Sequence, residues 1–167
     1  MTNITFHGGV NDIGGNKFLV ESKDTKVFMD FGMSFSQEGQ FFSQFLGART
    51  SNSLNDMFEL GILPKIKGLY RRDYARHMDF DGNEDTEIDA VLLTHAHVDH
   101  CAYLPYLRED IPIYCSEESK LILQNFDETS SSQYLTSKQR FQIYENKKGT
   151  MSKATGDKVA IPRRIEI

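Results

Sequence analysis

Cysteines and long apolar runs are scarce in this sequence. Its two cysteines, Cys101 and Cys115, are too few for the disulfide framework of a small exported domain. Both are expected to be reduced, and core packing is the usual role of free cysteines. No apolar run approaches the roughly 20 residues of a membrane-spanning helix, so no membrane partner is expected. Residues 1–7 have neither a basic start nor an apolar stretch, which predicts a cytoplasmic location.

Positive charge is also scarce, and it is unevenly distributed. The formal net charge is −5, with 11 basic and 21 acidic side chains in residues 1–133 but 8 basic and 3 acidic in residues 134–167. An acidic body argues against a dedicated duplex-DNA binder, whose phosphate contacts need a basic face. It is compatible with an enzyme that grips nucleic acid through a local groove. The composition, 39% hydrophobic and 26% charged, fits one globular domain with a single core.

Apolar runs separated by turns predict the order of the strands and helices. The early runs are expected to form strands, the second and third pairing as a hairpin. The continuous run from Ile88 to Thr94 predicts a strand buried on both faces. Strands followed by β–α alternation favour a layered α/β fold. The expected strands are 4–6, 17–21, 26–30, 88–94, 113–115, 159–161 and 163–167. The expected helices are one capped by Asn52 or Ser53 that runs through Leu60 and is followed by Gly61, one over 100–107, one capped by Ser116, and one over 137–147.

Three of the five histidines fall within six residues, directly after the buried strand. An extended chain places residues i and i+2 on one side, so His95 and His97 can present two imidazoles to one ion. Asp99 and His100 follow where a helix is expected to begin, and they can face the same pocket while binding a second ion. Imidazole and carboxylate suit zinc, with manganese or iron as alternatives. Structural zinc usually takes a closed, often thiolate-rich ligand set, and Cys101 is the only thiol nearby, so a catalytic site is favoured.

The motif resembles the signature of a known superfamily. His95-x-His97-x-Asp99-His100 matches the metallo-β-lactamase pattern His-x-His-x-Asp-His in full. The resemblance implies that the first two histidines bind one zinc ion and that Asp99 and His100 bind the other. In this role Asp99 could also orient the attacking water. Asp30 resembles the family's acidic residue at a strand end, which orients a ligating histidine; a turn aspartate is the alternative.

A second resemblance concerns the substrate. The glycine-rich segment 8–16 resembles the opening of ribonuclease J and its β-CASP relatives, which implies a hydrolase that cleaves RNA with a metal-activated water. The basic residues of 65–76 and the positive balance of 134–167 favour RNA as the partner, with solvated surface charge as the alternative. Two other functions stay open. One is a thioester or lactone hydrolase of the same fold, and the other is a non-catalytic domain used for binding or assembly.

Four ligands are too few for two metal ions. No histidine follows His100, whereas the family's remaining ligands come from later segments. Residues 1–167 are therefore expected to be a partial domain, the N-terminal half of an αββα metallo-β-lactamase sandwich without any β-CASP domain. A short protein with a decayed site is the alternative. We expect this chain alone to bind metal weakly and hydrolyse nothing at a useful rate, while the complete enzyme would hold two Zn²⁺ ions, or Mn²⁺.

Overall fold

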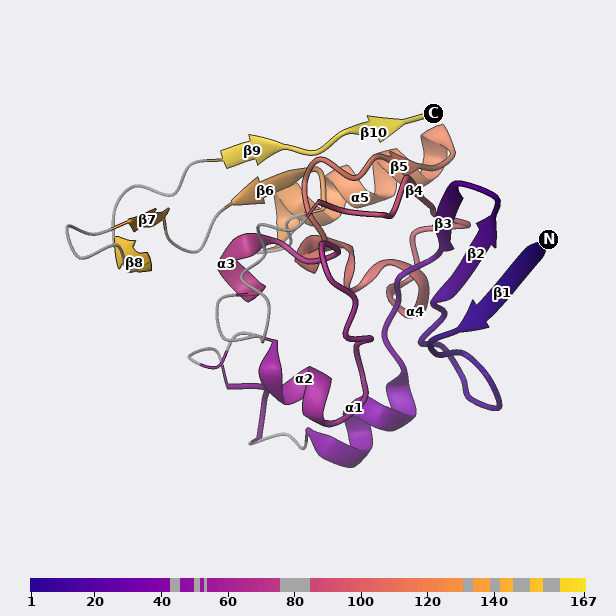
Figure 1. The fold of residues 1–167 in the computed structure, drawn as a ribbon, viewed down its shortest axis with the longest axis horizontal. Coiled ribbons are helices and arrows are strands. Elements are labelled where there is room, and N and C mark those ends of the chain that lie inside the picture. Colours follow the sequence, from indigo (N-terminus) through magenta and orange to yellow (C-terminus); the bar gives the residue numbers. More distant parts are fainter. Residues whose placement is uncertain are drawn as a thin grey trace.

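The computed structural model describes residues 1–42, 46–49, 52, 54–75, 85–130, 134–138, 142–145, 151–154 and 160–167. Its main feature is a six-stranded mixed sheet along the right and upper part of the molecule as drawn in Figure 1. The first three strands pair antiparallel, and the other three extend the sheet in parallel. The predicted hairpin and the layered α/β fold are therefore confirmed. In spatial order the strands are β1 (Thr2–Phe6), β2 (Phe18–Ser22), β3 (Thr25–Met29), β4 (Ala90–Leu92), β5 (Ile113–Tyr114) and β10 (Ile165–Glu166).

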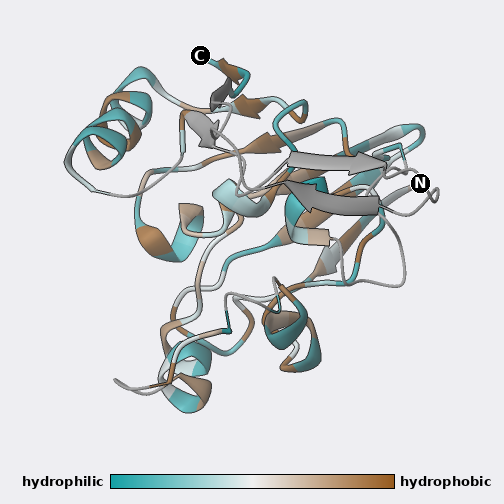
Figure 2. Cartoon of the chain, turned by 90° about the vertical axis from the view of Figure 1, so that its left-hand side faces the viewer, coloured by the Kyte–Doolittle hydropathy of each residue, from teal (hydrophilic) through white to brown (hydrophobic). Residues whose placement is uncertain are grey.

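The helices are short except for the last. Ser116 caps that helix, as predicted: its hydroxyl oxygen accepts a hydrogen bond from the Ser119 amide. Figure 2 shows hydrophilic and hydrophobic residues alternating along it. None of the helices in the described ranges is long and apolar enough to cross a bilayer. The helices are α1 (Phe35–Phe41), α2 (Asn55–Glu59), α3 (Arg72–Ala75), α4 (Val98–Cys101), the 3-10 helix η2 (Leu104–Tyr106) and α5 (Glu117–Thr129).

The two faces of the sheet have different environments. One row in register across four strands belongs to the hydrophobic core, and its members are Leu19, Phe28, Val91 and Ile113. The next row lies on the opposite face, because successive strand residues alternate. That row is also apolar, yet Phe6 is 58% and Leu92 42% exposed. Among the described residues, the row on the face of Leu19 and Phe28 therefore belongs to the core, whereas Phe6 and Leu92 on the other face are exposed.

The two faces should respond differently to truncation. Phe28→Ala removes a fully buried ring, and we expect it to lower the free energy of unfolding by about 3–5 kcal/mol. Leu92 follows Val91, the β4 partner of Phe28, and so lies on the other face of the sheet. Leu92→Ala should lower the free energy of unfolding by less than about 1 kcal/mol because the side chain is already partly in water. Chemical denaturation of both variants measures the difference. Equal losses would contradict the assignment of the two faces.

One predicted helix is wrong. Residues 137–147 were expected to be helical after a cap at Ser137, but the described part of this segment forms strands. β6 (Thr136–Lys138) pairs with β9 (Ala160–Pro162), and β7 (Gln142–Glu145) pairs with β8 (Met151–Ala154). Pairing with a later segment supplies the backbone hydrogen bonds that a helix would have made locally. A propensity argument restricted to 137–147 does not detect those partners.

Candidate metal centre

Two loops at the carboxyl ends of neighbouring parallel strands build the candidate site. The first follows β3 and the second joins β4 to α4, and backbone hydrogen bonds connect them. The Phe31 amide donates to the His100 carbonyl at 2.8 Å, and the Met33 amide donates to the Val98 carbonyl at 3.1 Å. The His-x-His-x-Asp-His segment is therefore held against the end of β3, where parallel α/β sheets place their chemistry.

Close backbone approach between these loops requires glycine at two positions. A Cβ atom added at Gly32 would lie 1.7 Å from the Asp99 carbonyl oxygen. At Gly14 it would lie 2.6 Å from the Asp99 Cβ, and there φ is +82°, a conformation that favours glycine. The Asn16 amide completes the contact by donating to the Asp99 carbonyl at 3.2 Å. The glycine-rich segment thus packs directly on the residue expected to bind metal.

His95 and His97 form the first pair of donor side chains. The Nε2 atom of His95 and the Nδ1 atom of His97 are 3.1 Å apart. Two nitrogens bound to one tetrahedral zinc, each at about 2.0–2.1 Å, would be about 3.3 Å apart. His95 is half-buried and His97 is exposed, so the pair is open to solvent on one side. Their chemistry and spacing fit a single zinc ion.

Asp99 and His100 form the second pair, and Asp30 lies behind it. The Nε2 atom of His100 is 3.3 Å from Oδ2 of Asp99, while its Nδ1 is 2.7 Å from Oδ2 of Asp30. A carboxylate only accepts, so the proton that faces Asp30 is on Nδ1, and the side-chain nitrogen of Asn16, which only donates, lies 3.2 Å from Nε2 and leaves that atom as the acceptor. The His95 and His100 ring centroids are 3.9 Å apart, so the two pairs adjoin.

Asp30 is itself fixed by its neighbours. It is 3% exposed, and its carboxylate accepts hydrogen bonds from both the amide and the hydroxyl of Thr94, at 2.8 and 2.9 Å. Its φ of +59° turns the chain sharply after β3. Asp30 therefore ties the end of β3 to the start of the metal motif as well as contacting His100.

The donors come as two pairs rather than as a complete ligand set. Within the described residues, no group of three or more His, Cys, Asp or Glu side chains is arranged to hold a metal ion. Catalytic zinc usually has three protein ligands. The donor types and pair spacings fit zinc, and each ion would need further donors.

Two residues near the site were not predicted from the sequence. The Asn16 side-chain nitrogen lies 3.2 Å from Nε2 of His100, and the Lys17 ammonium group donates to the carbonyls of Gly15 and Gly32 at 3.0 and 2.9 Å. Burial lowers the pKa of Lys17 to about 8. Asn16 ends the glycine-rich segment, and Lys17 begins the strand predicted after it. The contact from Lys17 to Gly32 spans 15 residues and that from Asn16 to His100 spans 84, so no local signal identifies these contacts.

Comparison with known proteins agrees with this geometry. Residues 69–157 match the family model described as a β-lactamase superfamily domain. The matched range includes all four side chains of the two pairs. The chain belongs to the metallo-β-lactamase superfamily. The predicted family is thereby confirmed, and with it the relationship to the β-CASP branch.

Several relatives of the superfamily resemble the chain over most of its length. Ribonuclease J of Helicobacter pylori is 30% identical over 134 residues, 78% of this chain and 15% of that protein. Transcription termination factor FttA of Methanocaldococcus jannaschii is 27% identical over 120 residues, 70% of this chain and 14% of that protein. A solved structure of a protein of unknown function from Enterococcus faecalis matches 77% of this chain and 28% of its own, with a TM-score of 0.58 and 31% identity. The chain thus spans about one seventh of these curated relatives.

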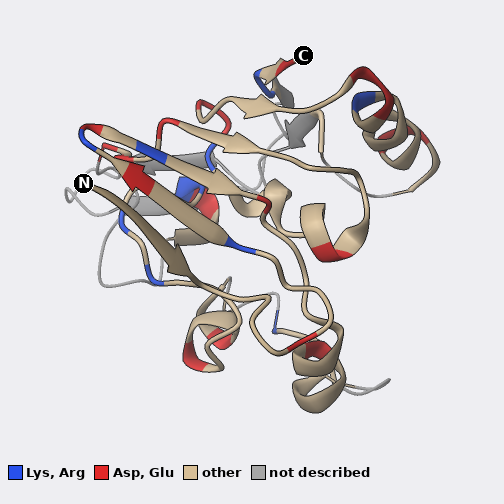
Figure 3. Cartoon of the chain, turned by 90° about the vertical axis from the view of Figure 1, so that its right-hand side faces the viewer, with Lys and Arg blue, Asp and Glu red and all other residues tan. Residues whose placement is uncertain are grey.

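The basic residues expected to bind RNA are not all available on the surface. Arg71 is 1% exposed, and its guanidinium group donates two hydrogen bonds to the Asp73 carboxylate, at 3.0 and 2.8 Å. Arg163 is also buried and donates to backbone carbonyls, while Lys65 pairs with Glu59. In Figure 3 basic and acidic residues lie side by side on the β2–β3 hairpin and on α5. The prediction that the basic residues of 65–76 bind RNA therefore does not hold for Arg71, because the Asp73 carboxylate, two residues along the chain, already binds its buried guanidinium group.

Arg71 should be important for stability instead. Arg71→Met leaves the Asp73 carboxylate buried without its cation, and we expect the free energy of unfolding to fall by about 3–5 kcal/mol. The double variant Arg71→Met/Asp73→Leu removes both charges and should recover most of that loss. Urea denaturation of the single and double variants tests this. A single variant as stable as the wild type would contradict the buried ion pair.

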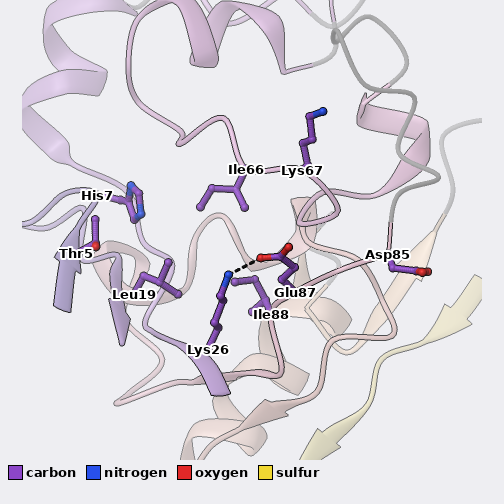
Figure 4. A pocket seen from close by; sticks show the side chains of 9 residues that line it. All are labelled: Thr5, His7, Leu19, Lys26, Ile66, Lys67, Asp85, Glu87 and Ile88. Atoms are coloured by element: carbon purple, nitrogen blue, oxygen red, sulfur yellow. Dashed lines mark hydrogen bonds and ion pairs between the residues drawn. The ribbon is translucent and has the colours of Figure 1, made fainter. Parts of the chain in front are cut away.

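A separate pocket of about 490 Å³ lies between the sheet and the segment before β4 (Figure 4). Its apolar walls come from Leu19, Ile66 and Ile88, and the paired side chains of Lys26 and Glu87 lie across it. The Nε2 atom of His7 is buried there without a hydrogen-bond partner in the described part of the chain. Neither donor pair lines this pocket, so it is distinct from the candidate metal centre.

Proposed function

We propose that this chain supplies one side of a two-zinc centre in a hydrolase that cleaves RNA. The main support is the placement of His95 Nε2 and His97 Nδ1 at 3.1 Å, beside the Asp99–His100 pair, in a chain of the metallo-β-lactamase superfamily. A relative named as a ribonuclease supports RNA as the substrate. Manganese in place of zinc is compatible with the same oxygen and nitrogen donors.

The side chains have distinct roles in this proposal. His95 and His97 hold the first ion, and Asp99 and His100 hold the second. Asp30 keeps the proton of His100 on Nδ1, so that Nε2 stays available as a ligand. The Asp99 side chain is 23% exposed, so its carboxylate is accessible to water and can also orient the attacking water. When bound, the two zinc ions would activate water at neutral pH and offset the charge that develops on the phosphate oxygens.

We also propose that donors outside these 167 residues complete the centre. Each pair gives an ion two protein ligands, fewer than the three that catalytic zinc usually has. The chain corresponds to only 15% of the ribonuclease J that it resembles, so other parts of a longer polypeptide can supply the rest. This predicts weak zinc binding by the chain alone and full activity only in the complete gene product.

One experiment separates the proposed function from its alternatives. The complete gene product, with zinc or manganese, is incubated with 5′-labelled single-stranded RNA and, separately, with a panel of thioesters and lactones. We expect metal-dependent RNA cleavage that weakens with rising salt and is lost in His97→Ala. Ester turnover without RNA cleavage would show that the substrate is a small molecule. No turnover of either substrate, with zinc bound, would indicate a binding or assembly domain.

A further inference from the structure

Lys17 is an unusual residue because its charge is buried with no acidic partner in contact among the residues that the structure describes. The side chain is 1% exposed, and its ammonium group donates to two carbonyl oxygens, those of Gly15 and Gly32. It also lies 5.4 Å from the centroid of the Tyr103 ring. A buried ammonium ion is costly, so a fold that keeps one has a close set of oxygen or aromatic partners for it. Here the two carbonyls belong to the glycine-rich segment 8–16 and to the loop after β3, and the Tyr103 ring lies beside the ammonium group.

The two carbonyls that Lys17 joins lead directly to the second donor pair. Asn16 follows Gly15, and its side-chain nitrogen lies 3.2 Å from His100 Nε2. The backbone amide of Asn16 donates to the Asp99 carbonyl. The Gly32 amide donates to the Asn16 carbonyl at 3.0 Å, and two residues before Gly32 lies Asp30, which contacts His100 Nδ1. The ammonium group therefore closes a ring of contacts around His100.

Space for the ammonium group is restricted. A Cβ atom added at Gly8 would lie 2.3 Å from the Gly15 carbonyl and 3.2 Å from Lys17 Nζ. The Tyr103 amide donates to the Phe31 carbonyl at 3.0 Å, so the aromatic side of the enclosure is attached to the same loop. The position of the ammonium group is thus set by backbone on three sides.

We propose that Lys17 is a positioning residue for the Asp99–His100 pair: by bridging the Gly15 and Gly32 carbonyls, it sets where Asn16 and Asp30 hold the His100 imidazole. This inference rests on the proposed zinc site. Loss of the bridge would let the glycine-rich segment separate from the loop after β3. His100 would then lose its fixed orientation without any change to a donor side chain.

The test compares two buried cations that both bind carbonyl oxygens. Lys17→Met removes the bridge, whereas Arg163→Met removes a cation whose carbonyl partners, such as that of Leu107, lie in another part of the fold. Both variants are prepared in the His97→Ala background, which leaves only the second donor pair intact. Zinc affinity is measured by competition with a chromophoric chelator, and the ¹⁵N resonances of the His100 imidazole are recorded without metal.

We expect Lys17→Met to weaken zinc binding by about tenfold or more and to shift the His100 resonances. Arg163→Met should lower thermal stability while leaving both readouts as in the parent. Unchanged readouts in folded Lys17→Met, or equal changes in Arg163→Met, would overturn the proposal. If Lys17→Met does not fold, Lys17→Gln, which keeps a neutral donor, is judged by the same criteria. Absence of zinc binding by the parent would count against the proposed function, and the His100 resonances would still decide the role of Lys17.

Discussion

Gly32→Ala is expected to disrupt the metal motif more than any other single-methyl addition in the described residues of the two loops. The new Cβ would lie 1.7 Å from the Asp99 carbonyl oxygen and 2.4 Å from the His100 nitrogen, both of them backbone atoms that cannot rotate away. The loops would have to separate, breaking the hydrogen bonds of Phe31 and Met33 to α4. We expect the free energy of unfolding to fall by about 3 kcal/mol or more and zinc binding to be lost.

Gly39→Ala provides the matched control. Gly39 lies in α1, and no atom comes within 4 Å of a Cβ built there. Alanine in a helix interior is favoured over glycine by about 1 kcal/mol, so this variant should be slightly more stable than the wild type, with unchanged zinc binding. Denaturant titration and chelator competition on both variants measure the contrast. A Gly32→Ala protein that keeps its stability and zinc affinity would refute the close approach of the loops.

Asp30→Ala should have the second largest effect, and it acts on two properties at once. The Thr94 amide and hydroxyl would lose the carboxylate that they share, which should cost about 1–3 kcal/mol of stability because the Asp30 side of these hydrogen bonds is buried. His100 would lose the acceptor for its Nδ1 proton, and loss of such a partner typically weakens metal affinity by about 10–100-fold. Calorimetric titration with zinc measures the second effect.

Asp89→Ala separates these effects from a general loss of negative charge. Asp89 is exposed, just before β4, and its carboxylate accepts from the Lys26 amide at 2.7 Å. We expect the zinc affinity of the Asp89→Ala protein to match that of the wild type. Asp30→Asn refines the comparison, because asparagine tolerates a positive φ and can still accept from Thr94. Zinc affinity in Asp30→Asn equal to that of the wild type would show that the carboxylate charge does not act on His100.

The sequence by itself predicted the candidate donor residues and the strand that precedes them. Strand geometry places residues i and i+2 on one side, and a continuous apolar run marks a buried strand, so both signals come from consecutive residues. This local information led to His95, His97, Asp99 and His100, and the family resemblance added Asp30. It failed where the partner lies elsewhere in the chain, as for the strands that replaced the helix at 137–147.

Only the tertiary structure decided which distant residues surround the donors and which charges remain on the surface. Asn16 meets His100 across 84 residues, and Lys17 meets the Gly32 carbonyl across 15, because the connection between β1 and β2 packs against the loop after β3 and the metal motif. Arg71 belongs to the basic run 65–76, which was expected to favour RNA binding, but packing buried it against Asp73. A run of charged residues has the same sequence whether its side chains are exposed or buried. Burial depends on which elements pack together, and that information is spread over the whole chain.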